Sequence, residues 1–402
     1  MRPDVIILGG GASGLAAAAA LGQRGARVTV LERSPRVGRK LLATGNGRCN
    51  LSNLDMRPMH YGDAAEFVSR AYEKAPPERV LGFFRDLGLM TAEEDARLYP
   101  RTMQAASVLD VLRAACERAG VSFVTDYEVA RLSPSRHGWT VASADGAVFS
   151  APTVLAAMGG SAAPQLGTDG GGARLLSDLG HTITPLYPAL VQLRCEHPAL
   201  RSLKGIRVRA RLVLTVDGRY AGEDEGELLF ADYGVSGVCV FQLSRFAAPA
   251  LDEGRDVRLS VDLLPEADDA WLGARIDALP GATAQSLFTG ALVRLLAQAV
   301  VREARVPADM PASELTASQR RALIAALKRF PLRVTGTQGF TSAQVTRGGV
   351  ALSEVDPTTM ASRLFDGLYI AGELLDVDGP CGGYNLHFAF ASSLVAAQSI
   401  KP

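Results

Sequence analysis

The stretch that decides the fold is "DVIILGGGASGLAAAAALGQRGARVTVLE", residues 4–32. It begins with a short apolar run typical of a buried parallel strand, continues through closely spaced glycines, and becomes rich in alanine over residues 13–24. Gly25 ends the predicted helix, and the apolar run before Glu32 predicts a second strand. A strand, a helix and a strand within about thirty residues form a β-α-β unit.

The glycines at the first turn of this unit have the spacing G-x-G-x-x-G. In a dinucleotide site the first glycine allows the tight turn, the second lets a pyrophosphate approach the backbone, and the third lets the helix and strand pack closely. The N-terminus of the helix then offers free N–H groups to the phosphates, and the acidic residue after the second strand accepts hydrogen bonds from a ribose diol. The predicted contacts of this half of the dinucleotide are Gly9, Gly11, Ala12, Ser13, Gly14 and Glu32.

The composition is that of an ordinary globular protein. Of 402 residues, 48% are hydrophobic and 21% charged, and the 42 basic residues equal the 42 acidic ones. A chain of this kind buries a core, and it lacks the basic excess that proteins binding nucleic acid or anionic membranes usually show. We therefore expect neither a nucleic-acid nor a membrane partner. The N-terminal apolar run is broken by glycines and preceded by Asp4, which disfavours a signal peptide or membrane span.

Cysteine and histidine usage excludes several site types. The five cysteines are widely spaced without a C-x-x-C pair, and the five histidines show no metal-ligand spacing. No metal site and no redox dithiol are predicted. Unpaired thiols suit a reducing compartment, so we expect a cytoplasmic protein.

Two segments distant in sequence are predicted to build one α/β domain, residues 1–188 and 339–402. Residues 189–338 form an insertion of roughly 150 residues, a size typical of a domain. Within it, residues 189–262 alternate polar and apolar side chains like antiparallel strands, whereas residues 263–330 have helical spacing.

Some local patterns give finer expectations. Arg207, Arg209 and Arg211 fall on one face of a predicted strand, because side chains alternate along a strand. The acidic run "EDEGE" (223–227) is predicted to be a solvated turn rather than a metal site. The C-terminal segment "GGYNLHFAFASSLVAAQSI" (382–400) is predicted to be an amphipathic helix.

Two further glycine clusters end buried strands, "VLAAMGG" (154–160) and "LYIAGELLD" (368–376). Strand ends that converge at the carboxyl edge of a sheet suit a long ligand such as FAD. Glu373 and Asp376 are then candidates for the ribityl hydroxyls. The helix that opens after Gly383 would place its positive end near the flavin pyrimidine.

The quoted segments are specific enough to suggest a family. "GRKLLATGNGRCNLSN" (38–53), "GTDGGGARLLSDLGHTITPLYPAL" (167–190), "GELLFADYGVSG" (226–237) and the long run from 345 to 390 resemble a bacterial flavoprotein family. Its members are described as aminoacetone oxidase-like or bile-acid reductase-like, within the glutathione-reductase-like FAD superfamily. The resemblance covers most of the chain and is weakest at 262–330.

The resemblance implies an α/β fold class, with a Rossmann-like FAD-binding domain of three layers about a parallel central sheet. It also implies that the insertion is a β-barrel with helices. Arg33 and Gly159 belong to the strand ends on the same edge. Two positions depart from the family pattern: Met158 stands where threonine is usual, and His387 stands where glutamine is usual. The cofactor-binding residues implied beyond the first unit are Arg33, Arg39, Lys40, Gly45, Asn46, Gly47, Cys49, Asn50, Gly159, Gly372, Glu373, Asp376, Gly383, Tyr384 and Asn385.

No catalytic residue is assigned from the sequence, and three candidates stay open. Cys49 is either a redox or flavin-attaching thiol, or a structural one. Arg48 either binds an anion or the reduced flavin, or forms a structural ion pair. His387 is either a general base over the flavin or a packed histidine.

The resulting prediction is an FAD-dependent oxidoreductase that acts on a small organic substrate. The flavin would be reduced by that substrate or by transiently bound NADH or NADPH. No second dinucleotide-binding β-α-β unit and no dithiol are present in the sequence, which argues against a disulfide reductase. The alternatives are an FAD-dependent RNA-modifying enzyme and a non-catalytic FAD-binding module. Neither the substrate, the final electron acceptor nor the oligomeric state is predicted.

Overall fold

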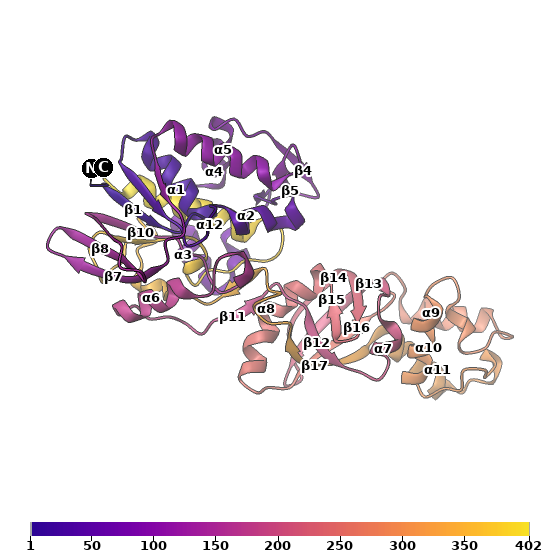
Figure 1. Cartoon of the computed structure of the whole chain (residues 1–402). Coiled ribbons are helices and arrows are strands. Elements are labelled where there is room, and N and C mark those ends of the chain that lie inside the picture. Colours follow the sequence, from indigo (N-terminus) through magenta and orange to yellow (C-terminus); the bar gives the residue numbers. More distant parts are fainter. Residues whose placement is uncertain (1, 402) are drawn as a thin grey trace. The chain divides into compact units, whose positions relative to one another are not determined.

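A computed structural model describes residues 2–401 of the chain (Figure 1). The chain divides into two compact units. Unit 1 comprises Met1–Tyr187 together with Ala343–Pro402, and unit 2 comprises Pro188–Ser342. Each unit has its own hydrophobic core.

The centre of unit 1 is a five-stranded sheet in the order β19-β10-β1-β2-β6. All its paired neighbours run parallel, with Val5 opposite both Thr153 and Val28. Every residue of the central strand β1 is buried, as the apolar run at the N-terminus predicts. The strands are β1 (Val5–Leu8), β2 (Val28–Leu31), β6 (Ser122–Val124), β10 (Thr153–Ala156) and β19 (Leu368–Ile370).

Helices cover one face of this sheet, and a three-stranded antiparallel sheet lies over the other face, so the predicted three-layer fold is confirmed (Figure 1). The helical layer contains α1 (Ala12–Gln23), α3 (Ala65–Lys74), α4 (Pro77–Asp86), α5 (Ala105–Arg118) and α12 (Tyr384–Ser399). The second sheet contains β7 (Val129–Ser135), β8 (Gly138–Ser143) and β9 (Val148–Ala151).

The prediction of an amphipathic C-terminal helix is wrong. Helix α12 is buried on nearly every side, including all residues from 387 to 397. The reason is that α1, α3 and α4 all contact it. A helix that is apolar all round is buried within its domain rather than lying at the surface.

Shorter elements complete unit 1. They are α2 (Arg39–Ala43), η1 (Thr44–Gly47), β3 (Ser52–Asn53), η2 (Pro58–Ala64), β4 (Thr91–Glu94), β5 (Arg97–Pro100), η3 (Pro164–Leu166), α6 (Gly171–Leu179), β18 (Val345–Arg347), η6 (Leu352–Glu354) and η7 (Gly372–Leu374). Strand β11 (Tyr187–Ala189) begins at the last residue of this segment of unit 1 and continues into unit 2.

Unit 2 contains a closed barrel in the order β12-β15-β14-β13-β16-β17, so the predicted barrel is confirmed. Its strands are β12 (Leu193–Glu196), β13 (Arg207–Val216), β14 (Arg219–Ala231), β15 (Gly234–Ser236), β16 (Val257–Asp262) and β17 (Phe330–Thr337). Its helices are α7 (Leu200–Leu203), α8 (Val238–Asp252), α9 (Asp269–Ala278), α10 (Arg294–Glu303) and α11 (Ala317–Lys328), with short turns η4 (Ser286–Phe288) and η5 (Ala312–Glu314).

Two elements of the insertion are not predicted from the sequence. Helix α8 lies within the stretch 189–262, which is predicted to be β-rich. Its buried residues Cys239, Val240, Leu243 and Ala247 recur at helical spacing, and this signal is hidden between alternating strands. Strand β17, which follows the helical stretch, closes the barrel and is not predicted.

The acidic run 223–227 is not a turn, because it lies within strand β14. Its glutamates pair with the exposed arginines of β13. The ion pairs are Arg207–Glu227, Arg209–Glu225 at 2.7 Å and Arg211–Glu223 at 2.6 Å. Each guanidinium is therefore matched by a carboxylate on the neighbouring strand.

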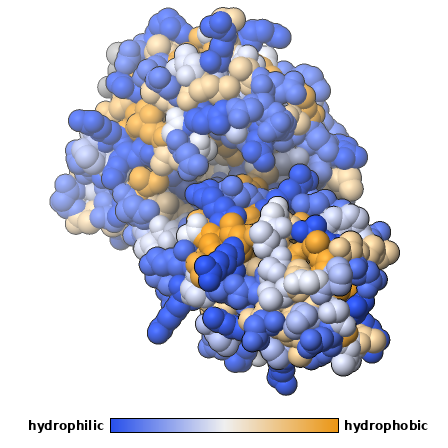
Figure 2. Space-filling model, turned by 90° about the vertical axis from the view of Figure 1, so that its right-hand side faces the viewer, coloured by the Kyte–Doolittle hydropathy of each residue, from blue (hydrophilic) through white to orange (hydrophobic). Residues whose placement is uncertain are grey.

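Large exposed hydrophobic side chains are distributed over both units, among them Met59, Met90, Tyr220 and Trp271. On the face drawn in Figure 2, hydrophobic residues appear as separate patches among mostly hydrophilic ones. Between residues 2 and 401, no helix is both long and apolar enough to cross a membrane.

We expect Gly14→Ala to destabilise unit 1 severely. A Cβ at this position would lie 1.9 Å from the backbone oxygen of Gly9, so helix α1 would have to move away from the turn after β1. The expected loss in free energy of unfolding exceeds about 3 kcal/mol. Gly273→Ala in α9 is the matched control, because its Cβ would meet nothing within 4 Å. Chemical denaturation measures both, and equal stabilities would contradict the packing argument.

Candidate functional site

The carboxyl ends of β1, β10 and β19 meet at one edge of the parallel sheet, where the glycine clusters lie. Gly9 has φ +100°, and an added Cβ would lie 2.6 Å from the backbone oxygen of Ala157 in the turn after β10. Its N–H donates to the carbonyl of Leu31, at 2.8 Å. The first and third glycines of the G-x-G-x-x-G pattern are thus required by contacts within the protein itself.

Gly11 differs from these two glycines, since an added Cβ would meet nothing within 4 Å. The space beside the second glycine is the room that a pyrophosphate needs at the start of helix α1. Close by, the Glu32 carboxylate accepts hydrogen bonds from the backbone N–H groups of Gly10 and Ser34, both at 2.8 Å. These two bonds fix the acidic group at the end of β2.

The beginning of α1 is joined to the C-terminal segment. The Ser13 hydroxyl donates to the carbonyl of Ala389 in α12, at 3.1 Å. Gly372, with φ +73°, approaches so closely that an added Cβ would lie 2.0 Å from Ser13 Oγ. The Gly372 N–H donates to the Ser392 hydroxyl, at 3.0 Å. Ala12, at the first position of α1, is half-buried beside this junction.

A salt bridge brings the two segments of unit 1 together at the same edge. Lys40 Nζ lies 2.6 Å from Glu373 Oε2, and both side chains are largely buried. Glu373 Oε1 accepts from the N–H of Thr346, at 2.8 Å. The Thr346 hydroxyl accepts from the N–H groups of Ser161 and Ala162, at 2.7 and 2.9 Å. Thr346 is a site residue that the sequence analysis did not single out.

The remaining basic residues near this edge also have partners. Arg33 forms an ion pair with Asp169 at 2.8 Å, and Arg39 donates to the carbonyl of Gln165 at 2.9 Å. Gly159 has φ +73° in the turn after β10. Both arginine side chains are therefore held by other residues of unit 1.

The loop after α2 is a run of left-handed backbone. Gly45, Asn46, Gly47 and Cys49 have φ of +56°, +55°, +83° and +58°. Glycine and asparagine adopt this conformation most readily, which explains the unusual composition "TGNGRCN". Asn50 then ties this loop to the start of α12. Its amide is best oriented with the oxygen accepting from the Gly383 N–H at 3.1 Å and the nitrogen donating to the Ser52 carbonyl at 2.8 Å.

The start of α12 is packed closely against this loop. An added Cβ at Gly383, which has φ +97°, would lie 2.4 Å from the Ser52 carbonyl oxygen. Asn53 Nδ2 donates to the carbonyl of Gly382 at 3.0 Å. Asn385 uses its side chain on the preceding turn, since Oδ1 accepts from the Gly379 N–H at 2.7 Å. The backbone groups of these glycines are thus bonded to Asn50, Asn53 and Asn385 at the helix N-terminus.

Cys49 and Arg48 are both engaged within the protein. The Cys49 thiol is fully buried, and this burial raises its pKa to about 12, so the reactive thiolate is suppressed. Arg48 forms an ion pair with Glu94, and its guanidinium lies 4.4 Å above the ring of Tyr99. The geometry favours the structural interpretation of each residue.

His387 is also fully buried, in the second turn of α12. Its Nδ1 lies 2.8 Å from the Ser52 hydroxyl, while Nε2 has no hydrogen-bond partner among residues 2–401. Desolvation lowers the pKa of His387 from 6.5 to about 3, so the imidazole is neutral at physiological pH. The geometry favours a packed histidine that holds the loop, not a general base.

Tyr384 and Asp376 lie at either end of the segment before α12. The Tyr384 ring packs against His60, with centroids 4.9 Å apart, and its carbonyl accepts from the Tyr61 hydroxyl at 2.9 Å. Burial raises the pKa of Asp376, and its N–H donates to the carbonyl of Val350 at 3.2 Å.

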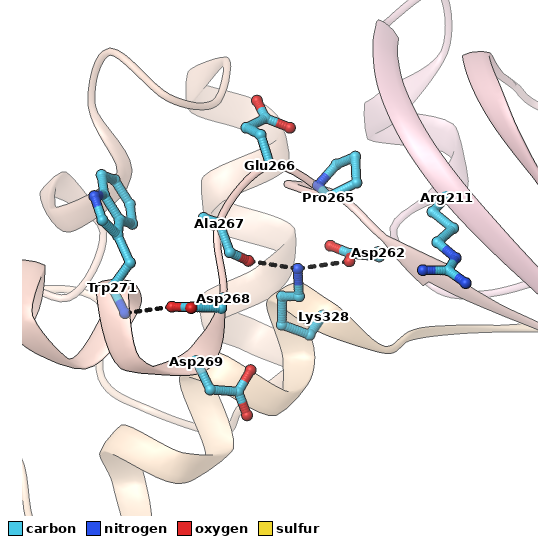
Figure 3. Close-up of a pocket in the computed structure, with 9 residues that line it drawn as sticks. All are labelled: Arg211, Asp262, Pro265, Glu266, Ala267, Asp268, Asp269, Trp271 and Lys328. Carbon is cyan, nitrogen blue, oxygen red and sulfur yellow. Dashed lines mark hydrogen bonds and ion pairs between the residues drawn. The ribbon is translucent and has the colours of Figure 1, made fainter.

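A separate hollow in unit 2 is lined by residues of β13, β16, α9 and α11 and of the loop between β16 and α9 (Figure 3). Lys328 Nζ lies 2.6 Å from Asp262 Oδ2 and donates to the carbonyls of Leu264 at 3.0 Å and Ala267 at 2.6 Å. With three acceptors the ammonium group is fully used, so this cluster fixes the end of α11. It carries no cofactor signature.

The buried neutral state of His387 predicts a specific pH dependence of stability. Below pH 6.5 the unfolded state takes up a proton at this residue that the folded state refuses, so stability falls as pH falls. Between pH 6.5 and pH 5 the free energy of unfolding should fall by about 2 kcal/mol more in the wild type than in His387→Gln, because glutamine does not titrate at this position. Urea denaturation at both pH values measures this difference. Identical losses would show that His387 is protonated in the folded protein.

Comparisons with known proteins support a flavoprotein. The family model described as "HI0933-like protein Rossmann domain" matches residues 3–399. A "3-dehydro-bile acid delta(4,6)-reductase" of Clostridium scindens is 40% identical over 400 residues, 98% of each chain. A "Ribosomal RNA dihydrouridine synthase" of Escherichia coli is 29% identical, covering 99% of this chain and 98% of its own.

A solved structure shares the fold. It is the 3-ketosteroid-delta4-(5alpha)-dehydrogenase of Rhodococcus jostii RHA1, with TM-score 0.53, 15% identity and coverage of 100% of this chain and 97% of the other. The glycine turn after β1, the space beside Gly11 and the acidic end of β2 fit FAD. The chain therefore belongs to the HI0933-like Rossmann family and is an FAD-dependent oxidoreductase.

Proposed function

We propose that this chain reduces a carbon–carbon double bond conjugated to a carbonyl group in a small cyclic substrate. The observation that carries this proposal is the 40% identity to a bile acid reductase over 98% of both chains, insertion included. That relative's name denotes reduction of double bonds in an acid with an oxo group at position 3. The same class of bond is saturated when dihydrouridine is formed, so the more distant relatives agree in chemistry.

The cofactor contacts that we propose follow the geometry of the sheet edge. Gly9, Gly11, Ala12, Ser13, Gly14 and Glu32 would hold the adenosine diphosphate half. Along the phosphates and flavin we place Arg33, Arg39, Lys40, Gly45, Asn46, Gly47, Cys49, Asn50 and Gly159. Around the ribityl chain and ring we place Gly372, Glu373, Asp376, Gly383, Tyr384 and Asn385. When bound, FAD supplies the two-electron chemistry, and the protein orients it and shapes the substrate side.

We also propose NADH or NADPH as the transient electron donor, because a reductase needs an external source of two electrons. The cytoplasm is the proposed compartment, since the buried thiols of Cys49, Cys116, Cys195 and Cys239 suit a reducing environment.

An RNA substrate is the second candidate, and the dihydrouridine synthase relatives favour it. Two features support the small substrate instead. The formal charge is zero, and the exposed arginines of β13 are each paired with a glutamate of β14. RNA phosphates could bind these arginines only after the ion pairs with the glutamates are broken. This cost would offset the gain from counterion release that usually drives binding to nucleic acids.

Anaerobic titration of the FAD-bound protein tests the proposed function. We expect NADH or NADPH to bleach the flavin absorbance, and a 4-en-3-one steroid to restore it with formation of the saturated ketone. Unmodified ribosomal RNA serves as the competing acceptor in a parallel reaction. If only RNA restores the flavin absorbance, the second candidate, an RNA substrate, is established. If neither the steroid nor RNA restores it, both proposed substrates are contradicted.

The open space beside Gly11 gives a second prediction. Gly11→Ala should leave the unfolding free energy of the apoprotein unchanged within about 0.5 kcal/mol, because the new Cβ meets no protein atom. The same methyl group would occupy the path of the pyrophosphate, so FAD affinity should fall at least about tenfold. Fluorescence titration with FAD measures this. An unchanged affinity for FAD would show that the pyrophosphate does not lie beside Gly11.

A further inference from the structure

We propose that His60 donates the proton that completes reduction of the substrate double bond, and that Asp55 positions it. This inference rests on the proposed function. Saturating a conjugated double bond adds a hydride to the carbon distant from the carbonyl group and a proton to the carbon next to it. The hydride comes from the reduced flavin, and the proton needs an acid on the protein or in the solvent.

The position of His60 follows from the loop already described. Asp55 follows that loop directly, and its N–H donates to Asn53 Oδ1 at 2.9 Å. Asn53 in turn donates to the carbonyl of Gly382 at 3.0 Å. The backbone of Asp55 is therefore fixed relative to the start of α12, where we place the flavin ring.

The His60 imidazole is held on two sides. Its Nε2 lies 2.9 Å from Asp55 Oδ2, and its ring packs on the Tyr384 ring at a centroid distance of 4.9 Å. The neighbouring Tyr61 anchors this segment, since its hydroxyl lies 2.8 Å from the Tyr72 hydroxyl and donates to the Tyr384 carbonyl at 2.9 Å.

The other ring nitrogen is available. Within residues 2–401, Nδ1 of His60 has no hydrogen-bond partner, and the side chain is 26% exposed. Because Nε2 faces a carboxylate, it carries a hydrogen in both protonation states of the ring. The hydrogen on Nδ1 is then the one that leaves. A carboxylate that orients an imidazole in this way is a recurrent arrangement in acid–base catalysis.

The neighbouring groups are less suitable as acids. Arg57 also binds Asp55, at 2.6 and 2.7 Å, and a guanidinium does not release its proton in proteins. His387 is buried and neutral. Burial also raises the pKa values of the Tyr61 and Tyr72 hydroxyls, which bond to each other. Among the histidines of this region, His60 alone combines a fixed ring with an open nitrogen.

The proposed step needs only the substrate, a hydride from the reduced cofactor, the proton of His60 and water. A new C–H bond forms at the carbon that receives the hydride, and a second C–H bond forms at the carbon next to the carbonyl group. The N–H bond at Nδ1 of the imidazolium breaks, and the electrons of the double bond form the second C–H bond. Reduced FAD, when bound, would supply the hydride and with it both electrons, and the neutral imidazole of His60 would recover its proton from water.

Reoxidation of the reduced holoenzyme tests this step in isolation. The FAD-bound protein is reduced with dithionite and mixed anaerobically with a 4-en-3-one steroid, and the flavin absorbance is followed. We expect the rate constant for His60→Gln to be about 10²-fold below that of the wild type. Its reoxidation by oxygen and its Kd for FAD should both change less than about twofold. His137→Gln, at an exposed histidine in the turn between β7 and β8, is the matched control and should behave as wild type.

Three results would contradict the inference. Equal rate constants for His60→Gln and wild type would show that the proton comes from elsewhere. If His60→Gln also slows reoxidation by oxygen or weakens FAD binding to a similar extent, the His60–Asp55 pair supports the cofactor and does not donate the proton. If the wild type itself is not reoxidised by any conjugated ketone, the proposed function fails first, and the inference falls with it.

Discussion

The structure depends on how closely three backbone segments approach one another at the end of strand β1. Only 1.9 Å separates the Gly9 oxygen from where a Cβ at Gly14 would lie, and a Cβ at Gly372 would be 2.0 Å from Ser13 Oγ. These approaches set the position of α1, and α1 contacts both α5 and α12. The helical layer of unit 1 is therefore built on a turn that accepts no side chain at Gly9 or Gly14. The same turn leaves room only at Gly11, which faces no protein atom.

This constraint explains why the first part of the fold is readable from sequence. The glycine spacing, the apolar β1 and the acidic Glu32 lie within one continuous stretch, so their geometry follows from local rules. Helix α5 is similar, because Leu109, Leu112, Ala115 and Cys116 show a helical period and are all buried. Periodicity succeeds where one face of an element is buried and the opposite face is exposed, as in α5.

The sequence was less informative where tertiary packing decides. Helix α12 is surrounded, so its pattern carries no period to distinguish a face. Helix α8 and strand β17 belong to a barrel whose closure joins residues more than a hundred positions apart, such as Cys195 and Val334. At the site, the pairing of Lys40 with Glu373 and the role of Thr346 are long-range contacts. Residue types alone could not reveal either.

The loop that contains Ser52 and Asp55 contacts two histidines, the buried His387 and the partly exposed His60. The surroundings of His387 suit a structural role, and those of His60 suit a chemical one. Ser52 holds His387 on the inner side of the loop, where desolvation keeps the ring neutral. A few residues later Asp55 holds His60, whose side chain remains partly open to solvent. A ring needs both a fixed orientation and an exit for its proton to act as an acid. His387 has the first without the second, whereas His60, on the loop before the helix, has both.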